Sequence, residues 1–288
     1  MKTKKLTKAL AEASVMIAFA TVLSLIKLVE MPYGGSVTLA SMLPIVIVAY
    51  RHGVPFGLLT GFTHAVIQQL IGLSSLSYFT TWQSILAVII LDYVLAFTIV
   101  GLGGFTKNRI GLKRADYPTR QRIEIAVGML FVCVLRYICH TVAGATVWAG
   151  LSIPTEAALI YSISYNATYM IPETIIAVLV AAWIGEVIDL SKNVPTRFSP
   201  SVTYEIKKQG VACEILPHIA TFLILFAVGF VTVIIAPYLQ DASSGEFTFE
   251  NLSCANWSLV LIVSSLCLVA AVVLYVVAHK LKGTQKTI

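Results

Sequence analysis

Charged side chains are scarce in this sequence. Aspartate, glutamate, lysine and arginine make up 12% of its 288 residues, which is about half of the share found in soluble domains. Hydrophobic residues account for 58%, and the mean hydropathy is +0.87. These proportions exclude a soluble globular protein and indicate a chain that crosses a membrane several times.

Signatures of catalysis and of metal binding are also missing. The sequence has no G-x-x-x-x-G-K-[ST] loop for ATP, no H-E-x-x-H, no G-x-S-x-G and no paired catalytic carboxylates. Its five cysteines form no C-x-x-C pair, which argues against a zinc site or a disulfide framework. We therefore expect no enzymatic activity, no cofactor and no metal site. Transport against a gradient would need energy from a partner protein or from an ion.

What the sequence does contain is a series of long apolar segments. A membrane-spanning helix needs about 20 mostly apolar residues, and eight segments are candidates, the second short and the sixth long. They are Ala9 to Val29, Thr38 to Tyr50, Val54 to Leu73, Trp82 to Phe105, Ile123 to Ala149, Ala157 to Leu190, His218 to Leu239 and Trp257 to His279. We predict an all-α, polytopic membrane helix bundle.

Basic residues fall on one side of this predicted topology. Eighteen of the 20 lysines and arginines lie before the first span, after the second, fourth or sixth span, or after the last one. The opposite loops carry five acidic residues and no basic residue. Because cytoplasmic loops collect positive charge, we expect an even number of spans with both termini in the cytoplasm. The net charge of +6 then reflects topology and gives no support for nucleic-acid binding.

Ionisable residues at membrane depth are costly and mark candidate functional sites. Asp92, followed by Tyr93, lies about ten residues inside the predicted fourth span, or roughly 15 Å from its outer end. In the fifth span, His140 lies at the matching depth, and Arg136 and Trp148 fall on the same stripe of the helix. We expect this stripe to form the wall of a pocket that opens to the outside.

The predicted sixth span adds polar and aromatic side chains at the same level. They are Tyr161, Tyr165, Asn166 and Tyr169. Among the formal charges at this depth, Asp92 and Glu173 face a single cation, so a cationic ligand would balance the site. Aromatic rings favour a flat or cationic heterocycle.

Structural roles and different functions suit some of these residues equally well. Arg136 and Glu173 also suit a structural ion pair within the membrane, and His140 suits a hydrogen bond between two helices. A stand-alone secondary transporter would use Asp92, Glu173 and His140 as a proton relay, but internal repeats typical of such transporters are not evident. A membrane enzyme would need a nucleophile or metal constellation, which the sequence does not show.

At these residues the sequence resembles a known family, the thiamine-specific substrate-binding subunits, or S-components, of energy-coupling factor (ECF) transporters. The resemblance covers about residues 6 to 190. It rests on Arg51-His52-Gly53, on the acid before Tyr93, on the block from Leu135 to Gly144 with Trp148, and on the block from Tyr161 to Asn166.

The resemblance implies a six-helix bundle that binds thiamine near the outer face, under the loop between the first two spans. In the family, positions that match His140, Trp148 and Tyr93 contact the ligand rings. Asp92 stands where an acid meets the cationic vitamin. Tyr161 and Asn166 match polar contacts, and Arg136 stands where the family commonly has lysine.

The resemblance also implies partners. An S-component works in the bacterial cell membrane with a transmembrane coupling protein and two ATPase subunits, besides membrane lipid. Ser14 and Ala18 best match the small residues that meet the coupling protein, a spacing that lets helices approach closely.

The sequence departs from the family in three respects. Asp92 is one methylene shorter than the usual glutamate, so a relative specific for another small heterocyclic vitamin is an alternative. Glu173 has no role in the family. The predicted domains are a six-helix core over 1–190, a cytoplasmic linker over 191–217 and an additional hairpin with a tail over 218–288, and the hairpin has no counterpart in the six helices.

Overall fold

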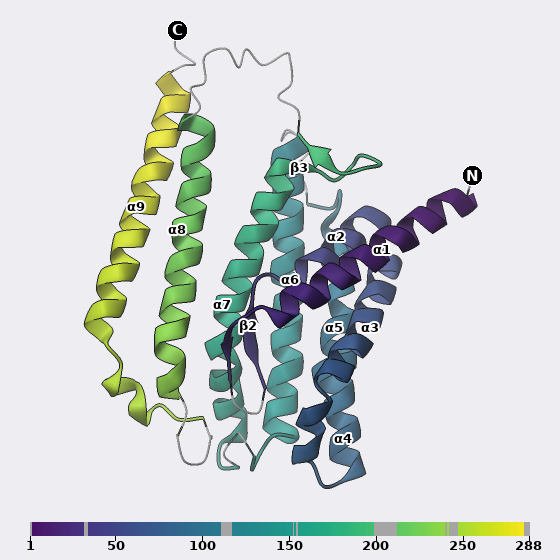
Figure 1. Cartoon of the computed structure of the whole chain (residues 1–288), viewed down its shortest axis with the longest axis vertical. Coiled ribbons are helices and arrows are strands. Elements are labelled where there is room, and N and C mark those ends of the chain that lie inside the picture. Colours follow the sequence, from purple (N-terminus) through teal and green to yellow (C-terminus); the bar gives the residue numbers. More distant parts are fainter. Residues whose placement is uncertain are drawn as a thin grey trace.

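The protein is a bundle of long helices. The computed structural model describes residues 2–31, 34–110, 117–151, 153, 155–198, 212–239, 241 and 247–284. Seven helices in these ranges are long and apolar enough to cross a membrane. The last turns of the C-terminal helix and β3 lie at one end of the bundle, and β2 and α4 lie toward the other, with α1 slanting across it (Figure 1). The chain is therefore a multi-pass, all-α membrane protein, as predicted.

Six helical units form the core. In chain order they are α1 (Lys2–Leu25), α2 (Leu43–His52), α3 (Val54–Ile71), a composite unit over 82–106, α6 (Tyr117–Thr146) and α7 (Ala158–Val187). A short 3₁₀ helix, η1 (Leu73–Tyr78), joins α3 to the composite unit. A two-stranded sheet of β3 (Ile188–Asp189) and β4 (Thr196–Arg197) follows α7.

The first predicted span is wrong at its C-terminal end. We expected a helix from Ala9 to Val29, but α1 ends at Leu25 and the chain turns into β1 (Lys27–Glu30). β1 pairs antiparallel with β2 (Ser36–Thr38), with Val29 opposite Val37. Gly34 and Gly35 reverse the chain at φ values of 110° and 84°, which side chains with a Cβ rarely adopt. We call β1, β2 and their connection the β1–β2 hairpin.

The second predicted span is too short to cross a membrane. Thr38 belongs to β2, and α2 has only 10 residues, or about 15 Å at 1.5 Å per residue. Every side chain from Leu43 to Tyr50 is buried. α2 is therefore an interior helix that α1, α3, α6 and the composite unit surround.

The fourth predicted span is helical throughout but irregular. It comprises α4 (Trp82–Val88), a π-helical segment η2 (Ile89–Leu95), α5 (Ala96–Thr98) and a 3₁₀ segment η3 (Ile99–Thr106). Glycine allows η3 to lie directly against its neighbours, because a Cβ on Gly101 would lie 2.2 Å from the carbonyl carbon of Gly57 in α3. A π-helical turn within an α-helix frequently accompanies a functional site, and here it contains Asp92 and Tyr93.

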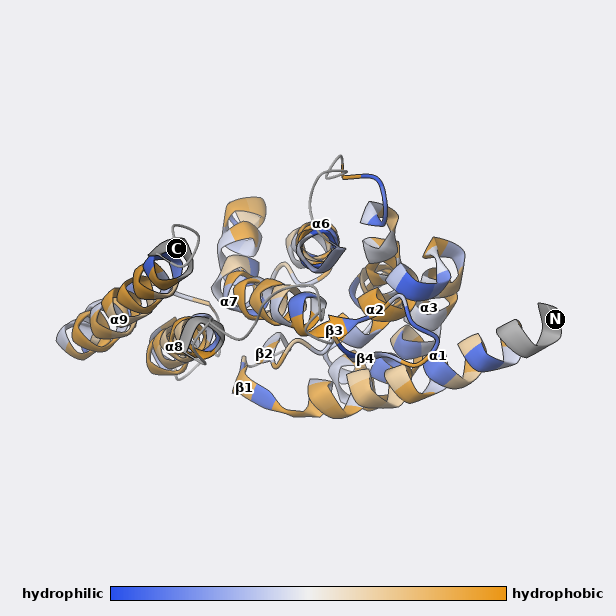
Figure 2. Cartoon of the chain, turned by 90° about the horizontal axis from the view of Figure 1, so that it is seen from above, coloured by the Kyte–Doolittle hydropathy of each residue, from blue (hydrophilic) through white to orange (hydrophobic). Residues whose placement is uncertain are grey.

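An additional pair of helices flanks the core. α8 (Ala212–Ile235) begins six residues before the predicted start at His218, continues as the 3₁₀ turn η4 (Ala236–Leu239), and packs on α7. There the indole Nε1 of Trp183 donates to Nδ1 of His218 over 3.1 Å. The turn η5 (Glu250–Cys254) leads into α9 (Trp257–Thr284), which packs along α8 at the edge of the molecule and is apolar along most of its length (Figure 2). About half of the predicted linker over 191–217, namely 199–211, lies outside the described residues.

A polar cluster at the C-terminal end of α2 joins this helix to α1 and to the segment after β3. Arg51 forms an ion pair with Glu12 of α1, and it also donates to the backbone carbonyl of Leu190 beyond β3. The Nε2 atom of His52 lies 3.1 Å from the same glutamate. These contacts fix the slanted α1 to α2 and to the segment that follows α7.

Close packing at Gly101 leads to a first prediction. Gly101→Ala should lower the free energy of unfolding by about 1 to 3 kcal/mol, because the added methyl group forces apart two backbones in contact. Unfolding in detergent measures the change. Gly229→Ala in α8 is the matched control, because its added Cβ would meet no heavy atom closer than 3.9 Å. Equal stability of the two variants would contradict the assigned contact.

Candidate functional site

A large cavity lies between the β1–β2 hairpin and the helices behind it. Its volume is about 710 Å³, which is within the range of sites for small organic ligands. β1, β2, α3, η1, η2, α6 and α7 all contribute to its wall, and Ser41 and Met42 line it just before α2 begins. The cavity therefore lies where the helical units of the core meet, and α2 borders it only through the residues before its first turn.

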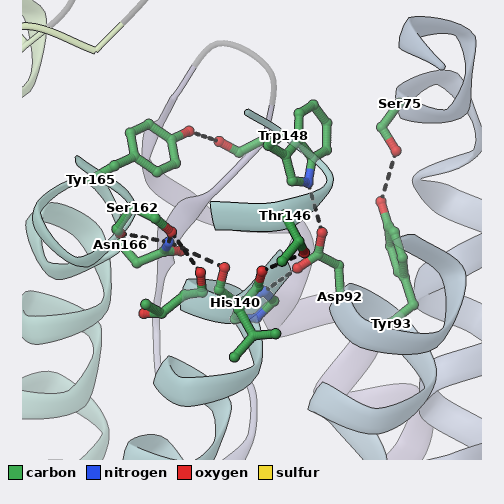
Figure 3. A network of polar contacts seen from close by, with 12 residues as sticks. Ser75, Asp92, Tyr93, His140, Thr146, Trp148, Ser162, Tyr165 and Asn166 are labelled. Atoms are coloured by element: carbon green, nitrogen blue, oxygen red, sulfur yellow. Dashed lines mark hydrogen bonds and ion pairs between the residues drawn. The ribbon is translucent and has the colours of Figure 1, made fainter. Parts of the chain in front are cut away.

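Asp92 is held by two ring nitrogens inside this cavity. Its Oδ1 lies 2.8 Å from Nδ1 of His140, and its Oδ2 accepts a hydrogen bond of 2.8 Å from Nε1 of Trp148 (Figure 3). Because a carboxylate only accepts hydrogen bonds, Nδ1 of His140 carries a proton in this contact. The structure thus brings together Asp92 and His140, which the sequence placed at matching depth, and Trp148, which it placed on the same stripe as His140.

Aromatic rings surround Trp148. Thr146 ends α6, so Trp148 lies in the turn beyond it rather than on the predicted helical stripe. Its ring is 4.8 Å from that of Phe79 at an angle of 74°, and 6.2 Å from that of Tyr78. These edge and tilted contacts are the arrangements that aromatic rings prefer, and they fix the indole at the cavity wall.

Tyr93 forms part of the opposite side. Its hydroxyl lies 3.0 Å from Oγ of Ser75 in η1 (Figure 3). Gly72 makes room for the phenol ring, because a Cβ there would lie 2.3 Å from the hydroxyl oxygen. The contact joins the end of α3 to the π-helical segment, so Tyr93 faces the cavity from a fixed position.

Asn166 connects α7 to α6 at the same level. Its amide nitrogen donates to the carbonyl oxygens of Ser162 and His140 over 2.9 and 3.3 Å, and its oxygen accepts from the hydroxyl of Tyr169 over 2.5 Å. Gly144 allows α6 to approach, since a Cβ there would lie 2.2 Å from Oγ of Ser162. Asn166 is thus positioned by hydrogen bonds from both helices.

Tyr165 connects α7 to the β1–β2 hairpin, which forms the cover of the cavity. Its hydroxyl donates to the backbone carbonyl of Gly34 over 2.7 Å. Through this bond the turn of the β1–β2 hairpin is attached to the same helix that carries Asn166.

A buried ion pair forms the deeper part of the cavity wall. Nη1 of Arg136 lies 3.3 Å from Oε2 of Glu173, and Thr38 of β2 donates to Oε1 of the same glutamate over 2.6 Å. The guanidinium also lies 5.0 Å from the ring centre of Phe97. This pair is the structural alternative that the sequence left open, and it explains the presence of Glu173.

Pairing decides the net charge of the cavity wall. Lys27 pairs with Glu30 in β1, and Arg136 pairs with Glu173. Of the charged residues that line the cavity, Asp92 is left with uncharged or titratable donors, namely the rings of His140 and Trp148. With His140 neutral, the wall carries one net negative charge, which favours a cationic ligand.

Six of the seven predicted binding residues line the cavity, and Tyr161 does not. Tyr161 packs instead with the hydrophobic residues around Tyr165 and Tyr169, because helical rotation carries it off the cavity face. Ser14 and Ala18 lie elsewhere, on the exposed face of α1. Thr38 and Ser75 were not predicted as site residues. Each reaches the site through tertiary contacts, and neither belongs to a motif that sequence spacing reveals.

Taken together, fold and site define a class of protein. A polytopic helix bundle that holds a polar, aromatic-walled cavity within the membrane is a receptor or transporter for a small molecule.

Comparisons with known proteins give the family. The sequence model described as "Thiamine transporter protein" matches residues 10–190. The thiamine transporter ThiT of Bacillus subtilis is 31% identical over 182 residues, which are 62% of this chain and 90% of that protein. A crystal structure of ThiT from Listeria monocytogenes superposes with a TM-score of 0.52 at 22% identity, covering 64% of this chain and 95% of that one. The chain belongs to the thiamine transporter family, whose members are transporters and not enzymes.

The buried pair leads to a second prediction. Glu173→Gln should lower the free energy of unfolding by about 3 kcal/mol, because it leaves the charge of Arg136 buried without a partner. Glu186→Gln in the same helix removes an exposed pair with Arg122 and should cost less than about 1 kcal/mol. Unfolding of both variants in detergent measures the difference. Similar losses would contradict the assignment of a buried pair.

Proposed function

We propose that the protein binds thiamine in the cavity under the β1–β2 hairpin and takes part in its uptake. The observation that carries this proposal is Asp92, the acid of the described cavity wall that pairs with no lysine or arginine, in a chain of the thiamine transporter family. Thiamine has a permanently cationic thiazolium ring linked to a flat aminopyrimidine. The charge and the aromatic wall of the cavity suit both parts.

Each predicted binding residue that lines the cavity has a role in this proposal. Asp92 faces the thiazolium charge. The rings of Trp148, Tyr93 and His140 stack on the ligand, and a well-placed aromatic ring contributes about 0.5 to 2 kcal/mol to binding a cation. Asn166 binds the aminopyrimidine through its amide. Arg136, held by Glu173, shapes the deeper end of the cavity rather than contributing net positive charge.

We further propose that the protein is an S-component of an ECF transporter in the bacterial cell membrane. Residues 1–190 form the binding domain, 191–217 a cytoplasmic linker and 218–288 the additional hairpin and tail. Both termini lie in the cytoplasm, because α2, although shorter than a full span, returns the chain from the cavity to the end of the bundle where Arg51 meets the segment after α7. A coupling protein with two ATPase subunits supplies the energy. The exposed apolar face of α1 supports the proposed docking of the coupling protein, because Leu10, Ser14, Ala18 and Val22 lie along it at a spacing of four residues.

A titration tests the binding proposal and gives the third prediction. Purified protein should bind thiamine with a saturable heat signal, and Asp92→Asn should weaken binding by about 2 to 5 kcal/mol, because it removes a charge contact in a partly buried site. Calorimetry measures both affinities. Parent-like affinity of Asp92→Asn would rule out its proposed role, and absence of heat with the parent would rule out thiamine.

Tryptophan fluorescence locates the ligand. Thiamine should quench the fluorescence of the parent, and Trp148→Phe should remove most of the change. Trp82→Phe is the matched control, because Trp82 is exposed and does not line the cavity. Equal loss of quenching in the two variants would place the ligand elsewhere.

A fourth prediction separates binding from transport. Ala18→Leu should leave the affinity for thiamine unchanged but reduce its uptake by cells at least severalfold, because the larger side chain prevents close approach of a partner helix. Ala270→Leu makes the same change on the exposed face of α9 and should not affect uptake. Normal uptake by Ala18→Leu would exclude this part of α1 as the docking surface.

A further inference from the structure

The α8–α9 pair lies outside the part of the chain that matches the family, yet it contacts the cover of the ligand cavity. The family match ends at residue 190, and α8 begins at Ala212. α8 packs against α7 on one side and against β1 on the other. α8 therefore contacts one of the two strands that cover the ligand cavity.

One hydrophobic cluster joins the cover to this helix pair. It contains Met31 and Val37 of the β1–β2 hairpin, Tyr165 and Tyr169 of α7, and Leu239 and Phe247 of the connection between α8 and α9; all are buried. Three segments that are distant in the sequence therefore share one core at this end of the molecule.

Phe247 occupies the centre of this contact. It is 2% exposed, and its ring meets the ring of Tyr165 edge-on, with 5.6 Å between centres and 81° between planes. The hydroxyl of Tyr165 in turn donates to the carbonyl of Gly34 in the β1–β2 hairpin. Phe247 thus reaches the cover through a single intermediate side chain.

α8 supports the cover at a second point. β1 and α8 are in contact, and Leu28 and Val29 of β1 pack against the same hydrophobic cluster as Val228 of α8. A smaller cavity of about 220 Å³ separates β1 from α8, and Met31 and Tyr169 line both this cavity and the larger one. β1 therefore contacts α8 directly over part of its length and borders a cavity beside that contact.

We propose that Leu239 and Phe247, which lie between α8 and α9, hold strands β1 and β2 closed over the ligand cavity, with Phe247 as the positioning residue. A two-stranded hairpin is marginally stable by itself, so its closure depends on the surfaces against which it packs. Because ligand entry and exit both require the hairpin to move, weaker anchoring should speed both steps. The identity of the ligand in this inference rests on the proposed function.

Kinetics provide the distinguishing measurement. For the full-length protein, stopped-flow fluorescence with thiamine should show that Phe247→Ala raises the association and the dissociation rate constants together, by about threefold to tenfold, the factor expected for loss of one aromatic contact. The dissociation constant should change little. Phe226→Ala is the matched control, because Phe226 lies on α8 and is 58% exposed. Parent-like rates in Phe247→Ala, or a faster dissociation alone, would overturn the proposal.

Hydrogen exchange tests the anchor without any ligand. Peptides that contain β1 and β2 should exchange faster in Phe247→Ala than in Phe226→Ala, whereas peptides from α6 should not change. Leu239→Ala, in the same buried cluster, provides a second variant if Phe247→Ala does not fold. Unchanged exchange in both variants would overturn the proposal. If the parent does not bind thiamine, the proposed function fails, and this measurement still decides the role of the anchor.

Discussion

The structure depends on one constraint, which is that a charge buried in a membrane protein needs a partner. Arg136 meets it with Glu173, and Asp92 meets it with the ring nitrogens of His140 and Trp148. These contacts require α6, α7 and the π-helical segment to lie at fixed distances, which the missing Cβ of Gly144 permits. The two acids differ in their partners, because Glu173 pairs with a guanidinium whereas Asp92 contacts two ring nitrogens, and the proposed function assigns the remaining charge of Asp92 to the ligand.

Most of the fold followed from the sequence, because apolar length and the distribution of basic residues report directly on membrane spans. The deviations share a cause. Hydropathy averages over a window, so it did not resolve the end of α1 at Leu25, the shortness of α2 or the π-helical segment in the fourth span. In each case, polar groups or tertiary contacts at the cavity determine the local backbone, and they are invisible to a composition average.

The site was predictable where it lies along one helix and less so where it lies between elements. The spacing of Arg136 and His140 placed both on the cavity side. Membrane depth pointed to Asp92, Tyr93 and Asn166, and the family resemblance gave them roles. The same approach failed for Tyr161, which faces the hydrophobic packing around Tyr165. It also missed Thr38, whose bond to Glu173 spans 135 positions of sequence. Residues so far apart in the sequence form no local pattern that would reveal their contact.

The length of α2 has an electrical consequence. Ser41 and Met42 line the cavity at one end of this helix, and Arg51 lies in the charged cluster at its other end. About 15 Å of dry, low-dielectric protein thus separates the two, half of the thickness of a bilayer. Where water fills the cavity, a membrane voltage falls mainly across that short insulating plug. A cation beside Asp92 then sits close to the potential of the solution on the cavity's own side, and nearly the whole field acts on it during passage to the other side.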